Sequence, residues 1–238
     1  MSNYYFIRHG QAGIRTRYDQ LSSLGLEQSR ALGEWLASRS VEFAAVISGG
    51  LNRQQETASA VAASYSRSGR HFPEIIIDTG WNEFDLDGVY ADIAPVLAAR
   101  DPQFRAEYEQ MLAHLADEGH SIHRRWTPCD LAVIRAWVTG SIPGCAESWT
   151  AFQARIASAW AGLSLSGRED NIAIFTSATP IAITLGCVLN ADPRTRFRLA
   201  GALYNTAYSV VRMQGGEASL FSFNNLPHLD RPELQTFR

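Results

Sequence analysis

The chain has 238 residues, which is enough for one α/β domain with an insertion but short for two large cores. Its composition, 46% hydrophobic and 19% charged, is typical of a globular protein and excludes a disordered chain. The net charge of −3 argues against a broad surface for nucleic acid or an anionic membrane, so an anionic ligand would need a local cluster of arginines. The start of the chain has no basic leader, no run of 18 apolar residues occurs, and the three cysteines form no CxxC pair. We therefore expect a cytoplasmic protein with reduced thiols and no metal site.

Strand and helix patterns alternate through the first third of the chain. Residues 4–7 form an apolar run that ends in Arg8-His9-Gly10, which is typical of a buried strand leading into a loop. Ser22 has the side chain of an N-cap and stands before an apolar stripe at helical spacing. The expected strands are 4–7, 43–47 and 75–77, and the expected helices run from Ser22 to about Arg39 and over about 51–65. This order predicts a layered α/β fold with parallel strands.

The alternation lapses between Glu83 and about Ile142, where helices are expected only over 101–116 and 129–138. We interpret residues 84–142 as a cap-like insertion in a single domain that spans 1–238. The alternation then resumes with a helix around 149–163, a strand over 172–176, a helix over 179–189 and a hairpin of strands 208–213 and 218–223. The fold class that we predict is a three-layer α/β/α sandwich with a mostly parallel sheet and a helical insertion.

Arg8, His9 and Gly10 follow the first expected strand, and the carboxyl ends of strands are where open α/β sheets bind ligands. A guanidinium holds phosphate oxygens through two parallel donors, and a neutral imidazole nitrogen is able to attack phosphorus and form a covalent intermediate. Gly10 would allow the backbone to approach an oxyanion closely. A chance tripeptide at a strand end is the alternative, and this segment alone does not exclude it.

The segment from Ser48 to Ala58 strengthens the phosphate hypothesis. It follows the second expected strand and opens a helix, with Arg53 in the first turn. Two arginines and a helix N-terminus together form a good site for a dianion, provided that the two strands are neighbours. A solvated arginine on a helix face is the common alternative.

These pieces together resemble the histidine phosphatase superfamily, also called phosphoglycerate mutase-like. The resemblance covers residues 6 to about 189, and the matching pieces keep the family's order and spacing. They are Phe6-Ile7-Arg8-His9-Gly10-Gln11, Leu21-Ser22 with Gly25 and Gln28, Ser48 to Ala58, Glu83 after the third strand, and Gly144-Cys145-Ala146-Glu147-Ser148.

The resemblance implies a role for each matching site residue. His9 would be the phosphorylated nucleophile, and Arg8 and Arg53 would bind the phosphoryl oxygens. Glu83 falls where the family places the acid that protonates the leaving oxygen and then activates water. Asp85, two residues later, leaves open that the acid is assigned to the wrong carboxylate, and Glu83 would then be an ordinary loop residue.

The sequence departs from the family pattern after the fourth expected strand. The family has a second histidine there, which donates to the phosphoryl group, and this chain has Ala178. Loss of one preorganised donor costs roughly a hundred- to a thousandfold in rate. Three explanations stay open: replacement donors nearby, a histidine from elsewhere, or a protein that binds phosphate without turning it over. We favour the first, and we include Ser177 among the phosphate-binding residues. The candidate donors are the hydroxyls of Thr176, Ser177 and Thr179 with the backbone amides at the helix start, and the candidate histidines are His120, His123 and His228.

Arg15 and Arg17 lie in a loop where the family often has a small polar residue that touches phosphate. They allow two interpretations, an additional anionic group on the substrate or a loop exposed to water. His120 and His123 form an HxxH pair in a basic stretch, but no further metal ligands are evident.

From these observations we expect a phosphoric monoester hydrolase that acts on a small phosphorylated metabolite through a phosphohistidine intermediate, with no metal or organic cofactor. A phosphoglycerate-mutase-type transfer is one alternative, and a catalytically weak phosphate-binding protein is the other. The expected partner is a small phosphate ester and neither nucleic acid nor membrane, and the sequence leaves a homodimer open.

Overall fold

The computed structural model describes residues 1–163 and 170–237, which divide into two compact units. The first unit consists of Met1–Gly13, Arg17–Glu83 and Ile156–Arg238, and the second of Ile14–Thr16 and Phe84–Arg155. The main segment of the second unit, Phe84–Arg155, begins where the insertion was predicted to begin and extends beyond the predicted end at about residue 142. The unit also takes in Ile14–Thr16, which we did not predict.

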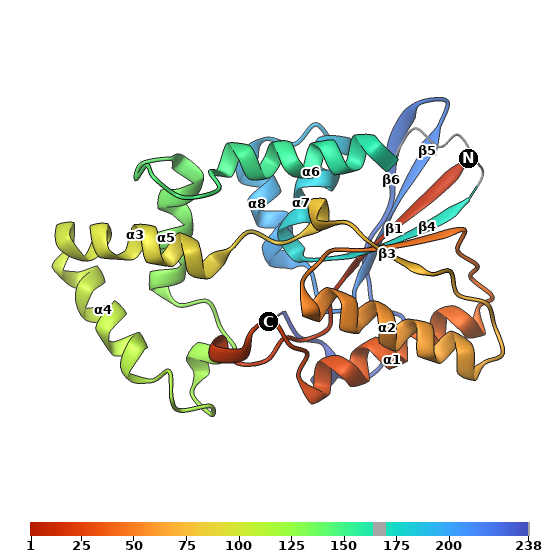
Figure 1. Ribbon diagram of the computed structural model, residues 1–238, viewed down its shortest axis with the longest axis horizontal. Helices are drawn as coiled ribbons and strands as arrows, with labels where there is room; N and C mark the ends of the chain where they lie inside the picture. The colour runs from red at the N-terminus through yellow and green to blue at the C-terminus, as the bar shows by residue number, and fades with distance from the viewer. Residues whose placement is uncertain (164–169, 238) are drawn as a thin grey trace. The chain divides into compact units, whose positions relative to one another are not determined.

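A six-stranded sheet forms the centre of the first unit (Figure 1). Its spatial order is β3-β2-β4-β1-β5-β6. The pairs β3–β2, β2–β4 and β4–β1 are parallel, whereas β5 and β6 continue the sheet antiparallel. The strands are β1 (Ser2–Arg8), β2 (Ala45–Ser48), β3 (Ile75–Ile77), β4 (Asn171–Thr176), β5 (Tyr208–Gln214) and β6 (Glu217–Asn225). The predicted mostly parallel sheet and its closing hairpin are confirmed.

Helices cover both faces of this sheet (Figure 1). On one face, α1 (Ser23–Ser38) and α2 (Asn52–Arg67) bury an apolar cluster that includes Leu32, Val61 and Ile7 of β1. On the other face, Trp160 of α6 (Trp149–Leu163) packs edge-on against Tyr4 of β1, and α7 (Ala178–Val188) and α8 (Pro193–Ala202) lie together. The predicted three-layer α/β/α architecture is therefore correct. No helix in the described residues is long and apolar enough to cross a membrane.

The second unit is helical. It contains α3 (Leu86–Arg100), α4 (Pro102–Ala113), α5 (Pro128–Thr139) and the start of α6, around the aromatic side chains of Phe84, Trp137 and Phe152. We did not predict α3, because Gly88 and Pro95 interrupt its pattern. Asp85 nevertheless caps its first turn by accepting from the Gly88 N–H. We also missed α8, whose ten residues include three arginines.

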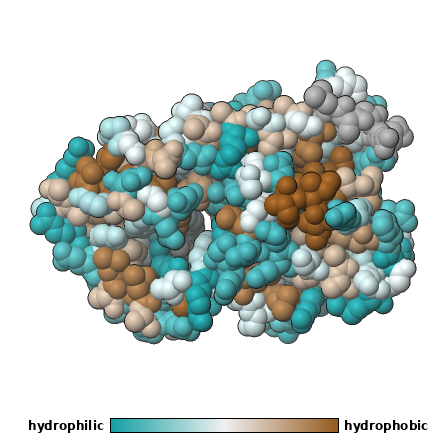
Figure 2. All heavy atoms as spheres, viewed as in Figure 1, coloured by the Kyte–Doolittle hydropathy of each residue, from teal (hydrophilic) through white to brown (hydrophobic). Residues whose placement is uncertain are grey.

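One edge of the sheet is apolar at its surface. β3 is an edge strand, and Ile76 and Ile77 are exposed there, where Figure 2 shows a compact brown patch. Such an edge offers backbone groups and apolar side chains to a neighbouring chain.

Candidate active site

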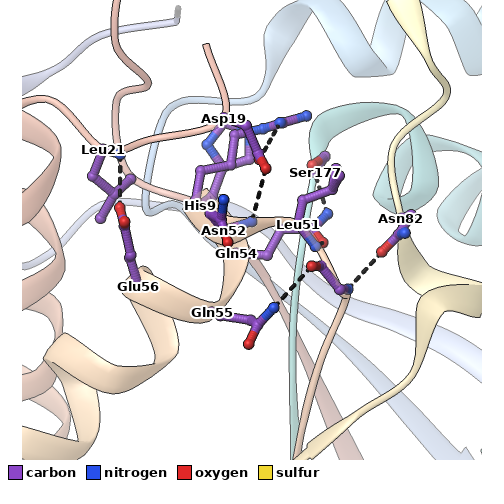
Figure 3. A network of polar contacts seen from close by, with 12 residues as sticks. His9, Asp19, Leu21, Leu51, Asn52, Gln54, Gln55, Glu56, Asn82 and Ser177 are labelled. Atoms are coloured by element: carbon purple, nitrogen blue, oxygen red, sulfur yellow. Dashed lines mark hydrogen bonds and ion pairs between the residues drawn. The ribbon is translucent and has the colours of Figure 1, made fainter. Parts of the chain in front are cut away.

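The carboxyl ends of β1 and β4 lie side by side, and the candidate site begins there. Arg8 pairs with Thr176 in the parallel register, and the N–H of His9 donates to the Thr176 carbonyl at 2.9 Å. His9 and Ser177 therefore directly follow the last residues of two adjacent strands. The first turn of α2 reaches both of them. Arg53 contacts His9, and Gln54 contacts Ser177 (Figure 3).

The hydrogen bonds of His9 determine its tautomer. Nδ1 lies 2.7 Å from the carbonyl oxygen of Gly10, which can only accept, so Nδ1 carries the proton. Nε2 lies 3.3 Å from Nε of Arg53, which can only donate, so Nε2 presents a lone pair. Nε2 is therefore the ring nitrogen that can act as a nucleophile, once the Arg53 N–H has moved from its lone pair.

His9 is buried, with 2% of its surface exposed, and it is neutral at physiological pH. Burial disfavours the imidazolium form, and the charges of Arg53 and Arg8 disfavour it further, so the pKa of His9 lies well below its usual value. A neutral imidazole at pH 7 is the form that a nucleophile requires.

Backbone contacts hold His9 and Gly10 in place. The His9 carbonyl accepts from the Thr206 N–H at 3.3 Å and from Nδ2 of Asn205 at 3.2 Å. We expected Gly10 to admit an oxyanion to the backbone, but its N–H donates to the Thr57 hydroxyl at 3.0 Å. The glycine is required for a different reason, because a Cβ there would lie 2.4 Å from the Gly25 carbonyl oxygen of α1.

Arg53 lies in the first turn of α2, as predicted, and it is buried. Its Nη1 donates to Asp19 at 2.9 Å, and the Tyr18 ring lies 5.0 Å from the guanidinium carbon. The Asp19 carboxylate also accepts from the Asn52 N–H at the start of the helix (Figure 3). Among the described residues, no acceptor takes the hydrogens of Nη2, so this group is available to a phosphoryl oxygen.

Arg8 is buried beside His9, but carbonyl oxygens engage its guanidinium. Nη1 donates to Leu203 and Nη2 donates to Phe237 at 2.6 Å. What the structure assigns to Arg8 directly is a positive charge that lowers the pKa of His9.

Glu83 and Asp85 have different surroundings. A carboxylate oxygen of Glu83 accepts from the Thr179 N–H at 3.1 Å, which places Glu83 at the start of α7, directly after Ser177 and Ala178. Asp85 is exposed and serves as the N-cap of α3. Of the two carboxylates, the structure brings Glu83 to the end of β4.

Polar groups around Ala178 differ in whether they have a hydrogen to donate. The Thr176 hydroxyl donates to the Trp81 carbonyl at 2.5 Å, and the Thr179 N–H is taken by Glu83, so neither is available as a replacement donor. The Ser177 hydroxyl accepts from Gln54 at 2.8 Å. Among the described residues, no acceptor takes the hydrogen of this hydroxyl or the Ala178 N–H. Together with the Thr179 hydroxyl, from which none of the described residues accepts, these two groups are the donors that remain.

The three candidate histidines have other partners. His228 is buried, and its Nε2 lies 2.9 Å from the Thr206 hydroxyl. That hydroxyl donates to the Asn205 carbonyl, so the proton lies on Nε2 of His228. In the second unit, His123 is buried rather than solvated and accepts from the Arg15 N–H, while His120 stacks on His114 at 4.0 Å. No contact in the described residues joins any of the three to His9.

Arg15 is not a water-exposed loop residue, which corrects that interpretation of this position. Its guanidinium forms a bidentate pair with Asp130, and its Nε donates to the Ile122 carbonyl at 2.7 Å. Arg15 therefore holds the short segment Ile14–Thr16 within the second unit. Arg17, by contrast, is exposed.

Sequence reasoning missed Asp19 and Gln54. Asp19 stands in a polar loop with no local pattern that marks it as a partner of Arg53. Gln54 follows Arg53 directly, so helical spacing alone places it near the site, but its contact with Ser177 spans 123 positions.

Comparison with solved structures finds the same fold at low sequence identity. YhfR from Bacillus stearothermophilus has a TM-score of 0.64 and 16% identity, covering 97% of this chain and 100% of that chain. Phosphoglycerate mutase from Bacillus anthracis has a TM-score of 0.61 and 14% identity, covering 96% and 95%. Alpha-ribazole phosphatase from Shigella flexneri has a TM-score of 0.60 and 18% identity, covering 94% and 96%. At these identities the likeness shows the fold.

Comparison of the sequence with family models assigns the chain to a family. Comparison with curated proteins gives no match. The model of the histidine phosphatase superfamily (branch 1), however, matches residues 4–129 and 117–226, well over half of the chain. The chain therefore belongs to the histidine phosphatase superfamily.

Proposed function

We propose that this protein is a phosphatase that acts on a small phosphorylated metabolite through phosphorylation of His9. The observation that carries the proposal is the state of His9, a buried neutral imidazole whose Nε2 lone pair lies beside the Arg53 guanidinium. Family membership supports phosphoryl transfer as the reaction class. Solved structures with this fold include proteins named phosphatase and one named mutase, so the acceptor has to be tested directly.

The reaction has two steps. In the first, His9 Nε2 attacks phosphorus in line with the ester oxygen, the N–P bond forms, the P–O bond breaks, and Glu83 in its acid form gives its proton to the leaving oxygen. In the second, water attacks the phosphoryl group, the Glu83 carboxylate takes the proton from water, and the N–P bond breaks. The products are the alcohol, inorganic phosphate and the original enzyme, and each step uses only groups of the chain and water.

Charge on the transferring phosphoryl group requires fixed donors. The described residues leave four donors available around the two strand ends: Nη2 of Arg53, the hydroxyls of Ser177 and Thr179, and the Ala178 N–H. Donors that are already oriented cost no reorganisation when charge develops, which is why such groups contribute strongly to rate. Arg8 adds a buried positive charge beside them.

The proposal is tested with 4-nitrophenyl phosphate and a panel of phosphorylated metabolites, with release of inorganic phosphate as the readout. We expect turnover by the wild type and none by His9→Ala, and acid-labile phosphate on the wild type alone. Equal inactivity of both proteins from pH 5 to 8, with phosphate still bound, would instead indicate a phosphate-binding protein. Phosphate transferred to a sugar acid rather than to water would indicate a mutase.

The role of Glu83 is tested with leaving groups of different basicity. An acid matters most for a leaving oxygen that is a poor leaving group without its proton. We expect Glu83→Gln to lower kcat/KM at least tenfold more for an alkyl phosphate than for 2,4-dinitrophenyl phosphate, and the matched variant Asp85→Asn to lower neither. Equal losses on both esters for Glu83→Gln would remove Glu83 as the proton donor.

A further inference from the structure

The Gln54 side chain lies fully buried between the first turn of α2 and the end of β4 (Figure 3). Space for it depends on Gly49, since a Cβ at that position would lie 2.0 Å from Oε1 of Gln54. A buried amide with a dedicated space suggests a role beyond filling volume.

Two backbone groups determine which way this amide faces. Oε1 accepts from the Leu51 N–H at 3.3 Å, and Nε2 donates to the Trp81 carbonyl at 3.3 Å. If the amide were reversed, an N–H would face the Leu51 N–H and a carbonyl would face the Trp81 carbonyl. Both contacts would then be repulsive, so only one orientation is acceptable.

The orientation of Gln54 in turn determines what the Ser177 hydroxyl can do. Nε2 of Gln54 donates to Ser177 Oγ at 2.8 Å, so this bond uses a lone pair of the oxygen and not its hydrogen. The hydroxyl hydrogen is directed away from Gln54. Ser177 directly follows Thr176, whose strand lies next to that of His9. A phosphoryl group on Nε2 of His9 would therefore be a nearby acceptor for the Ser177 hydrogen.

We infer that Gln54 is a positioning residue that turns the Ser177 hydroxyl into a fixed donor to the phosphoryl group. The inference rests on the proposed function and deepens it. The pair would supply the hydrogen bond that the histidine absent at position 178 cannot make. It is built from a hydroxyl on β4 and an amide on α2, which belong to different elements of the first unit.

A purely structural role for Gln54 is the competing explanation, because its Oε1 also caps the start of α2. The two roles differ in one respect. A cap stabilises the helix whether or not Ser177 has a hydroxyl, whereas positioning has no effect on rate once that hydroxyl is removed.

A double-mutant cycle separates them, with kcat for 4-nitrophenyl phosphate and the thermal unfolding midpoint measured for each variant. We expect Ser177→Ala to lower kcat about 100-fold. Gln54→Met should lower it about tenfold, since the hydroxyl remains but is able to rotate. In the Ser177→Ala background, Gln54→Met should change kcat less than about twofold. Gln55→Met is the matched control, because that amide donates to the Gly50 carbonyl and should leave kcat unchanged.

Gln54→Glu adds a readout that helix capping would not move. A carboxylate only accepts, so it would attract the Ser177 hydrogen and remove the donor, whereas a protonated carboxyl donates again as the amide does. We expect kcat of Gln54→Glu relative to wild type to rise at least about threefold as the pH falls from 8 to 5.

The outcomes are distinct for the inference and for the proposed function. Equal losses from Gln54→Met in both backgrounds, or a flat pH ratio for Gln54→Glu, would overturn the positioning role while wild-type turnover keeps the phosphatase proposal. A wild type as inert as His9→Ala would overturn both.

Discussion

Two arginine–carboxylate pairs, one in each unit, differ in how many hydrogen-bond donors of the arginine they occupy. In the second unit, Arg15 and Asp130 bury each other, with 10% and 0% of their side chains exposed. In the first unit, Arg53 is buried but its partner Asp19 is 43% exposed, and only Nη1 takes part in the pair. All three nitrogens of the Arg15 guanidinium therefore donate to structural partners. Arg53 lies beside the nucleophile His9, and no acceptor among the described residues takes the hydrogens of its Nη2. Residue type and charge alone do not distinguish these roles; the number of donors already occupied does.

The pKa of the Asp130 carboxyl reflects the closed character of its pair. Burial acts to raise this pKa, but the Arg15 guanidinium and hydrogen bonds from Thr127 and Tyr90 outweigh burial and hold it at about 2. The pKa of this carboxyl is near 3.8 in the unfolded chain and lower in the folded protein. The pair therefore stabilises the fold at pH values above 3.8, and this stabilisation is lost as the pH falls towards 2. The Arg15–Asp130 pair is thus fully formed across the physiological range.

The largest effect that we expect comes from breaking the closed pair. Asp130→Ala would leave the Arg15 charge buried without its carboxylate, which typically costs about 3–5 kcal/mol in the free energy of unfolding. Urea unfolding followed by circular dichroism measures this loss. Asp19→Ala is the comparison and should cost less, because Asp19 is 43% exposed and water can reach Nη1 of Arg53 once the carboxylate is removed. Similar losses in the two variants would show that burial does not separate the pairs.

Removing the open pair's arginine should instead affect chemistry. Arg53→Ala deletes the donor beside His9 Nε2, and the loss of one preorganised donor lowers kcat/KM by roughly a hundred- to a thousandfold. Hydrolysis of 4-nitrophenyl phosphate measures the loss, and the thermal midpoint shows whether the fold is intact. An Arg53→Ala variant that keeps kcat/KM within threefold of wild type would contradict the assignment of this arginine to the phosphate.

Acid should weaken the first unit through its buried histidines. Burial lowers the pKa of His228 to about 4, so below pH 6.5 the unfolded chain binds a proton that the folded chain does not. Stability from this group is present above pH 6.5 and decreases as the pH falls towards 4, by about 2 kcal/mol at pH 5. His9, whose pKa is also lowered, acts in the same direction.

His228→Gln isolates this contribution. The variant should keep more of its pH 7 unfolding free energy at pH 5 than the wild type does, in urea titrations at both pH values. His71→Gln, at an exposed position, is the control and should follow the wild type. Identical acid sensitivity of wild type and His228→Gln would assign the acid loss to other groups.

The sequence predicts features that depend on local patterns and misses those that depend on pairings between distant residues. The strands and helices of the first unit follow from apolar runs and caps, such as Ser22 accepting from the Gly25 N–H, because these signals are local. The contact between His9 and Arg53, and the place of Glu83 beside the end of the neighbouring strand β4, agree with the predicted parallel topology. How many donors each arginine keeps depends on a distant carboxylate. For Arg15 this is Asp130, 115 positions away, and for Arg53 it is Asp19, 34 positions away. Such pairings carry no local pattern, so only the structure reveals them.

The smallest effect that we expect comes from changing the open pair's charge without changing its shape. Asp19→Asn keeps the shape of the side chain and one acceptor oxygen, enough for the bond from Arg53 but not also for the bond from the Asn52 N–H. It removes a negative charge on the far side of the guanidinium that a dianionic substrate approaches. KM should therefore fall about two- to fivefold at low ionic strength with little change in kcat, because an exposed charge is worth up to about 1 kcal/mol. Since salt screens exposed charges, the difference should shrink at high ionic strength. A KM that rises instead would mean that Asp19 acts mainly by holding Arg53 in place, and the open pair would then resemble the closed one.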